Sequence, residues 1–165
     1  MFVEIVGPEG ERLKVGPPQP GDGRWMWEVA RAAGGLDVNS AYAYLLWVRD
    51  FSETTSIVHK GEDVVAYCTA YMRPDATETL FIWQVAVAPT HRRLGLGRAM
   101  LSDLVLRSGA SAMEATVTLG NESSWRLFRN FADSCNANVT ITELFTESDF
   151  PDGHDAEQLL RIEPL

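Results

Sequence analysis

The segment WQVAVAPTHRRLGLGR, which runs from Trp83 to Arg98, carries the clearest chemical pattern in the chain. It ends an apolar run, passes a proline and two arginines, and places glycines at Gly95 and Gly97. Glycines directly after a strand let successive backbone N–H groups turn toward one point, and a helix that begins there adds its positive end. The pattern predicts a site for an anion such as a pyrophosphate, with Arg92 or Arg93 beside it. A plain tight turn with two surface arginines is the alternative.

Two other classes of glycine-rich phosphate loop fit this segment less well. A P-loop ends in Gly-Lys-Ser/Thr, whereas Gly97 is followed by Arg98 and Ala99. A dinucleotide-binding turn requires glycine at its sixth position, where this chain has Met100. The pattern Arg-x-x-Gly-x-Gly, starting at Arg92, therefore describes the turn best.

Composition narrows the class of protein. The chain has 165 residues, of which 45% are hydrophobic and 22% are charged, as expected for one globular domain. Its net charge of −9 argues against partners such as nucleic acid or an anionic membrane surface, and permits a cationic substrate. The apolar runs reach only strand length and the N-terminus lacks a signal-peptide pattern, so we expect a cytoplasmic protein. Whether residues 1–10 are ordered stays open.

The cysteines and histidines follow no metal-site spacing. The chain has two cysteines and no CxxC, and Cys68 is expected to be a buried small hydrophobe without a base partner. The histidines are scattered and are expected at the surface: His59, His91 and His154. We therefore expect neither a metal nor a cysteine nucleophile.

Hydrophobic spacing predicts the elements that must position the glycine turn. Helices are expected over 23–33, capped by Asp22, over SAYAYLLWVRDF, capped by Asn39 or Ser40, and over GLGRAMLSDLVLRSG and ESSWRLFRNFA. The expected order is strand, two helices, three strands, helix, strand, helix and two strands, which is a mixed α/β sheet protein. The turn then joins a strand to a helix, and residues 146–156 form a loop before the last strand.

The segment QVAVAPTHRRLGLGRAML resembles the acetyl-coenzyme A motif of the GNAT (GCN5-related N-acetyltransferase) family, and the order of elements also matches that fold. The resemblance implies an α/β fold with a mixed central sheet of about six to seven strands and flanking helices. It implies that residues 1–165 are a single acetyltransferase domain that uses acetyl-CoA as cosubstrate, without a metal.

The resemblance also assigns coenzyme contacts. Val85 and Val87 would make backbone contacts with the pantetheine arm, and the Val87 amide would stabilise the thioester oxyanion. The pyrophosphate would lie near Arg92 or Arg93 and be bound by consecutive backbone amides, those of Leu94, Gly95, Leu96, Gly97 and Arg98.

Two residues after the fifth family strand also follow from the resemblance. Asn121 matches an asparagine that contacts the coenzyme arm, and it suits a helix N-cap equally well. The family often has a tyrosine seven residues later that protonates the leaving thiolate, but this chain has Phe128. The thiolate would then leave unassisted, or water or another group would protonate it.

Four separated blocks resemble, more narrowly, the L-2,4-diaminobutyrate acetyltransferases of ectoine synthesis: Leu36–Phe51, Leu80–Val87, Glu114–Phe128 and Leu144–Ile162. Two departures are TLGN in place of TPSN before the last helix, and Asp155 in place of a glutamate after Gly-His. The implied reaction is direct attack of the substrate's 4-amino group on acetyl-CoA in a ternary complex. The subfamily also implies a homodimer.

Substrate contacts follow from the same resemblance. Asp37 and Glu157 would bind the ammonium groups of this diamine, and Glu157 is also a candidate for the base. Taken alone, Asp37 suggests a capping acid and Glu157 a solvated charge. Trp83, two residues before Val85, is expected on the same face of its strand, as pocket wall or core. Further candidates are Asn39 and Tyr42 for the pocket, His154 as a second proton acceptor, Glu114 as a less favoured base and Arg73 for the substrate carboxylate.

Two other functions stay open. One is an acetyltransferase of the same fold that acts on another small amine. The other is a non-catalytic acyl-CoA binding module, which the phenylalanine at position 128 favours.

Overall fold

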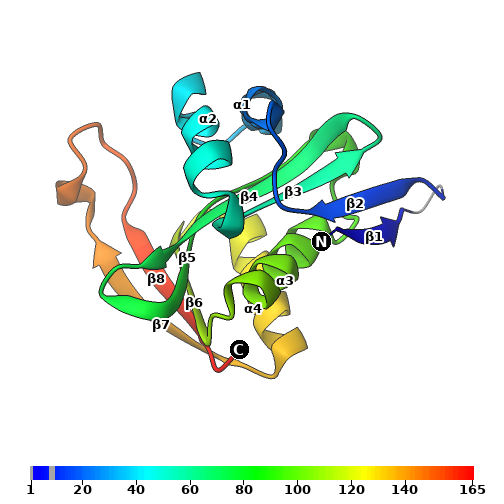
Figure 1. The fold of residues 1–165 in the computed structure, drawn as a ribbon. Helices are drawn as coiled ribbons and strands as arrows, with labels where there is room; N and C mark the ends of the chain where they lie inside the picture. The colour runs from blue at the N-terminus through cyan, green and yellow to red at the C-terminus, as the bar shows by residue number, and fades with distance from the viewer. Residues whose placement is uncertain (1, 8–9) are drawn as a thin grey trace.

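The computed structural model describes residues 2–7 and 10–165, and within them eight strands form one sheet (Figure 1). The strand order is β1-β2-β3-β4-β5-β6-β8-β7, and neighbours are antiparallel except for β5 and β6, which are parallel. The strands are β1 (Val3–Val6), β2 (Arg12–Gly16), β3 (Thr55–Lys60), β4 (Asp63–Arg73), β5 (Ala76–Val87), β6 (Ala112–Thr118), β7 (Asn138–Phe145) and β8 (Glu157–Glu163). The mixed α/β architecture is as predicted, with one more strand than expected.

Helices cover both faces of the sheet. The helices α1 (Asp22–Ala33) and α2 (Ala41–Asp50) lie on one face, and α3 (Leu96–Ser108) and α4 (Glu122–Cys135) lie on the other (Figure 1). Three short 3-10 helices complete the fold: η1 (Ser52–Thr54), η2 (Pro89–His91) and η3 (Glu147–Asp149). The larger core lies under α3 and α4 and includes Met100, Leu104 and Phe131, while a smaller one under α1 and α2 includes Met26 and Tyr67.

The helices follow the prediction closely, but some local assignments were wrong. Asp22 does not cap α1 from outside, because Gly21 is the N-cap and Asp22 is the first helical residue. The Asp22 carboxylate instead accepts from the Gln19 amide at 2.7 Å and lies 3.1 Å from His59 Nε2. His59 is therefore buried rather than at the surface. Cys68 is buried, as predicted.

The N-terminal segment forms a hairpin where the sequence predicted one strand. Val3–Val6 pair with Arg12–Val15 in antiparallel register. Residues 1, 8 and 9 lie outside the described residues, and whether residues 1–10 are ordered stays open. At α2 the cap is Ser40, whose hydroxyl accepts from the Ala43 amide, and not Asn39.

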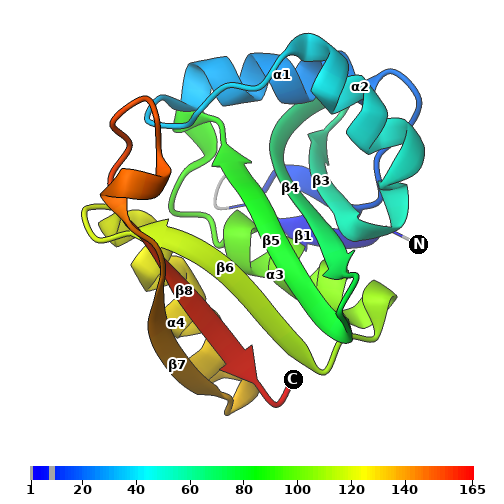
Figure 2. The ribbon, with the colours of Figure 1, turned by 90° about the vertical axis from the view of Figure 1, so that its left-hand side faces the viewer.

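One irregularity in β5 shapes the centre of the sheet. In the β4–β5 pair, Thr69 faces Gln84 while the next residue, Ala70, faces Ile82, so Trp83 is an extra, bulged residue. The parallel pairing of β5 with β6 also ends at Ile82, opposite Ala115. From that point the two strands diverge (Figure 2). A bulge bends its strand and increases its twist, which accounts for the divergence.

Candidate active site

The glycine turn has the geometry of an anion site. Gly95 has φ 74° and ψ 10° and caps α3, and Arg93 also has a positive φ of 65°. The first amides of a helix have no partner within the helix, so those at the start of α3 are available to a ligand. Gly97 has a different role, because a Cβ there would lie 2.9 Å from Leu127 Cδ1. A glycine at this position lets α4 approach the turn closely.

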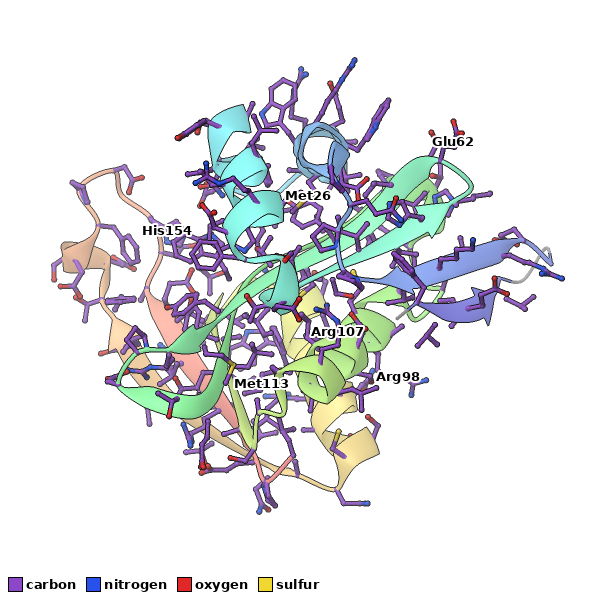
Figure 3. All side chains as sticks on the ribbon, viewed as in Figure 1. Met26, Glu62, Arg98, Arg107, Met113 and His154 are labelled. Carbon is purple, nitrogen blue, oxygen red and sulfur yellow. The ribbon has the colours of Figure 1, made fainter. Side chains whose placement is uncertain are left out.

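The arginines around the turn differ in what they contact. The Arg92 guanidinium donates to the carbonyl of Ala33, so it fixes the C-terminal end of α1 against the turn. Arg93 is exposed. Arg98 is also exposed and points from α3 away from the sheet (Figure 3). Positive charge on this side of the turn therefore comes from side chains that reach into solvent, while the turn itself offers backbone N–H groups.

The divergence of β5 from β6 leaves a strand edge open beside this turn. Val85 and Val87 pair with Cys68 and Ala66 of β4 on one side. On the other side, in the part of the chain that the structure describes, β5 has no strand partner after Ile82. Backbone groups on that edge can hydrogen-bond to an extended ligand that carries amide groups. This open edge of β5 precedes the turn that leads to the N-terminus of α3.

Trp83 does not share a face with Val85, contrary to the prediction. Val85 packs against the core under α3, whereas the Trp83 ring lies 5.3 Å from that of Trp47 on α2 and remains 53% exposed. The prediction assumed strict strand alternation, and the bulge at Trp83 shifts that alternation by one residue. Trp83 is thus a surface aromatic on the α2 side of the sheet and not a core residue.

Asp37, His154 and Glu157 meet on this same side. His154 Nε2 lies 3.6 Å from Asp37 Oδ2 and 3.7 Å from Glu157 Oε1. The three come from the α1–α2 loop, the β7–β8 connection and the start of β8, and these segments lie side by side in Figure 2. His154 projects from its connection toward the helices (Figure 3). We refer to these three residues as the acidic cluster.

Hydrogen bonding defines the state of the His154 ring. His154 Nδ1 donates to the Asp155 carbonyl at 2.7 Å, so in the neutral ring Nε2 is unprotonated and faces both carboxylates. That hydrogen bond raises the pKa of His154, and the charges of Glu157, Asp37 and Asp152 raise it further. Nε2 is therefore ready to accept a proton, or a hydrogen bond from a cation that enters the cluster.

Glu157 is the less solvated of the two carboxylates. Burial raises its pKa, and nearby His154 and Thr116 lower it only in part. Its Oε2 is buried and has no hydrogen-bond partner among the described residues, whereas the Asp37 side chain is 95% exposed. A buried acceptor without a partner suits a cationic ligand or a proton.

The other predicted pocket residues lie near the cluster without contacting it. Asn39 is half-buried, and Tyr42 on α2 is 67% exposed. Within residues 10–165, neither makes a hydrogen bond to the acidic cluster. Trp83 lines a groove of about 580 Å³ whose other walls include Tyr71, Phe81, Thr116, Phe145 and Leu159.

Glu114 is not available as a base, and Arg73 is not free for a substrate carboxylate. The Glu114 carboxylate is buried and accepts from Arg73 Nη1 at 2.8 Å and from Arg161 Nη1 at 2.7 Å. Arg73 also donates twice to Asp75. This network ties β4, β6 and β8 together, so both earlier suggestions are corrected.

Asn121 and Phe128 both have structural roles. The Asn121 side chain caps α4 by accepting from the Ser124 amide at 3.1 Å. Phe128 is buried in the larger core. It has no proton to donate and does not reach a solvated site, so the usual family acid is absent at this position.

Sequence reasoning missed Gln84. Its side chain is buried and connects Tyr44 of α2 and Tyr67 of β4 to the backbone of Asp37. The available signal was a single amide in the otherwise apolar run from Leu80 to Val87. The alternation of side chains along a strand does not predict which face Gln84 occupies once a bulge precedes it, so its contacts were not predictable.

The comparisons with known proteins agree with this geometry. Residues 24–132 match the acetyltransferase (GNAT) family, which is more than half of the chain, so this protein belongs to the GNAT family. Within it, the chain is 43% identical to the L-2,4-diaminobutyric acid acetyltransferase of Streptomyces coelicolor, over 93% of this chain and 94% of that protein. The enzyme of the same name from Halomonas elongata is 35% identical over 98% of this chain and 86% of its own length.

A solved structure supports the same relationship. The diaminobutyrate acetyltransferase EctA from Paenibacillus lautus, in complex with its substrate L-2,4-diaminobutyric acid and coenzyme A, superposes with a TM-score of 0.88. It is 38% identical, and the match covers 94% of this chain and 96% of that one. Within the described residues of the present chain, no helix is long and apolar enough to cross a membrane.

Proposed function

We propose that this chain is a diaminobutyrate N-acetyltransferase, which moves the acetyl group of acetyl-CoA to the 4-amino group of L-2,4-diaminobutyrate. The product, N4-acetyl-L-2,4-diaminobutyrate, belongs to ectoine synthesis. The observation that carries the proposal is the acidic cluster of Asp37, His154 and Glu157, beside the open edge of β5 in a GNAT fold whose relatives act on this diamine.

The residues present fit acetyl-CoA. The pyrophosphate suits the amides of residues 94–98, and the pantetheine arm suits the β5 edge at Val85 and Val87. The coenzyme supplies an acetyl thioester, and the Val87 amide is proposed to donate to its carbonyl oxygen. Asn121 is proposed to contact the pantetheine arm through its side-chain NH₂ group, because its Oδ1 caps α4.

The acidic cluster is proposed to bind and deprotonate the amine. An alkyl amine is mostly ammonium at neutral pH, and only the neutral form attacks. Asp37 is proposed to hold the 2-ammonium, while the 4-ammonium donates toward Glu157 and His154 Nε2. One of these two accepts the proton, and holding the nitrogen in place makes the direct attack effectively unimolecular. Trp83, with Asn39 and Tyr42, is proposed to form the pocket wall.

The test is release of free thiol from acetyl-CoA with L-2,4-diaminobutyrate, beside lysine, ornithine, spermidine and a blank, with mass spectrometry of the product. Preference for diaminobutyrate and acetylation at N4 support the proposal. Preference for another amine would keep the fold and discard the substrate. Tight coenzyme binding without turnover on any amine would indicate a binding module instead.

We also propose that residues 1–165 form one acetyltransferase domain, because both helical layers share a single sheet. The proposals of a homodimer and of a cytoplasmic location both rest on the subfamily resemblance. Light scattering of the eluted protein at micromolar concentration tests the dimer: a mass of one chain would refute it.

A further inference from the structure

The Gln84 side chain has a defined orientation in the smaller core. It is 9% exposed, and its Oε1 accepts from Tyr67 Oη at 2.5 Å and from Tyr44 Oη at 3.1 Å. Its Nε2 donates to the Asp37 carbonyl at 2.9 Å. A backbone carbonyl only accepts, so the Asp37 oxygen requires the NH₂ group on its side, and this leaves Oε1 to accept from the two tyrosine hydroxyls.

Tyr67 keeps this role over a wide pH range. Burial raises the pKa of Tyr67, and the adjacent Tyr44 raises it further. The Tyr67 hydroxyl therefore remains protonated and remains a donor. The two rings also make an edge contact, with centroids 5.8 Å apart. The amide is thus held by groups from β4 and α2 that do not depend on ligand.

The backbone that carries Asp37 is restrained by the packing of Leu36 against the smaller core and by few hydrogen bonds. The loop between α1 and α2 begins with Gly34 and Gly35, both at positive φ. In the described residues, the Gln84 bond is the one hydrogen bond to the backbone of residues 35–39. Since the Asp37 side chain is almost fully exposed, its own packing does not fix its position. Gln84 therefore supplies the hydrogen bond that, together with the packing of Leu36, sets the distance of 3.6 Å between Asp37 Oδ2 and His154 Nε2.

We propose that Gln84 is a positioning residue for the amine substrate, because its amide holds the Asp37 loop, and with it the carboxylate proposed to bind the 2-ammonium, beside His154. The inference rests on the proposed function. The bulge of β5 would then have two roles. Trp83 lines the proposed pocket, and the next residue, Gln84, positions the Asp37 carboxylate of the α1–α2 loop.

Three variants test this role. Gln84→Met removes all three hydrogen bonds at similar volume. Gln84→Glu keeps an acceptor for the tyrosines and changes only the group that faces Asp37. Thr69→Val is the matched control, because Thr69 Oγ1 donates to the Gln84 carbonyl at 3.4 Å at the same bulge and does not contact Asp37. Melting temperature and the Kd of acetyl-CoA are measured for each.

For Gln84→Met, we expect KM for L-2,4-diaminobutyrate to rise about tenfold while the Kd of acetyl-CoA stays within about twofold. For Thr69→Val, we expect a loss of melting temperature without that rise in KM. For Gln84→Glu, the introduced carboxyl can donate to the Asp37 carbonyl only when protonated. The ratio of its kcat/KM to that of the wild type should therefore fall as pH rises from 6 to 9.

The result that overturns the inference is an unchanged KM for diaminobutyrate in Gln84→Met, or an equal rise in Thr69→Val. A Gln84→Glu ratio that does not vary with pH also contradicts it. These outcomes differ from failure of the proposed function, which would appear as a wild-type enzyme that does not acetylate diaminobutyrate. A folded Gln84→Glu variant is sufficient for the test if Gln84→Met does not fold.

Discussion

Replacing Gly95 by alanine separates backbone strain from ligand binding at the turn. Gly95 has φ 74°, and a Cβ built there meets nothing within 4 Å. The substitution therefore causes no clash, and its effect comes from the left-handed conformation, which costs an L-residue about 1–2 kcal/mol. For a chain of this size, that free energy corresponds to a loss of about 2–8 °C in melting temperature.

Gly61, in the turn between β3 and β4, provides the matched control. It has φ 63°, and a Cβ there also meets nothing within 4 Å. Gly61→Ala should therefore lower the melting temperature by a similar amount. Because its turn lies beside Glu62, away from α3 (Figure 3), it should leave the KM for acetyl-CoA unchanged.

The kinetic effect should appear only in Gly95→Ala. The turn can relieve its strain by rotating the peptides around position 95, and the amides at the start of α3 then no longer converge. We expect the KM for acetyl-CoA to rise about tenfold, a loss of one or two hydrogen bonds to a charged group. The KM for diaminobutyrate at saturating acetyl-CoA should not change. Equal coenzyme KM values in the two variants would refute the assignment of the turn to the pyrophosphate.

Three further predictions concern charged and core residues. Burial raises the pKa of Glu157, so its ionised carboxylate destabilises the fold at pH values above that pKa. The Glu157→Gln variant should therefore melt about 2–4 °C higher than the wild type at pH 8 but not at pH 4. Its kcat/KM should fall about a hundredfold. A melting difference that does not depend on pH would contradict the reasoning. Phe128→Tyr should not raise kcat, and it should lower stability by about 1–3 kcal/mol in chemical denaturation, because the new hydroxyl is buried in the core. A gain in kcat would show that the hydroxyl reaches the thiolate. Glu114→Gln should lower the melting temperature by weakening its bonds to Arg73 and Arg161, yet leave the pH–rate profile unchanged. Loss of the acidic limb, where the rate rises as the base deprotonates, would restore Glu114 as the base.

Much of the fold was predictable because local patterns agree with it. The helices follow apolar spacing, and the glycine turn between β5 and α3 is where the sequence predicted it. Only the family resemblance predicted that Asp37 and Glu157 lie in one site, because 120 positions separate them in the sequence. No spacing rule reports a contact between a loop and a distant strand.

What the sequence did not predict depends on tertiary contacts. The sequence predicted His59 at the surface, but in the fold it is buried beside the Asp22 carboxylate, which is also buried. The bulge at Trp83 has no local signature, because the residues around it all suit a strand. Strict alternation therefore placed Trp83 with Val85, and Gln84 received no role.

The bulge explains how one strand can serve two ligands. Without an extra residue, alternation would put every second side chain of β5 on one face and keep the strand parallel to β6 throughout. With Trp83 inserted, Trp83 contacts α2 and Gln84 bonds to Tyr44 of that helix, while Val85 and Val87 pack under α3. The strand also leaves β6 at this point, which opens the edge that suits pantetheine. The proposed coenzyme site thus relies on backbone N–H groups and a helix end, and the acidic cluster lies on the side of the sheet that α1 and α2 cover. This separation would let a protein with a net charge of −9 bind an anionic coenzyme and a cationic amine at the two proposed sites.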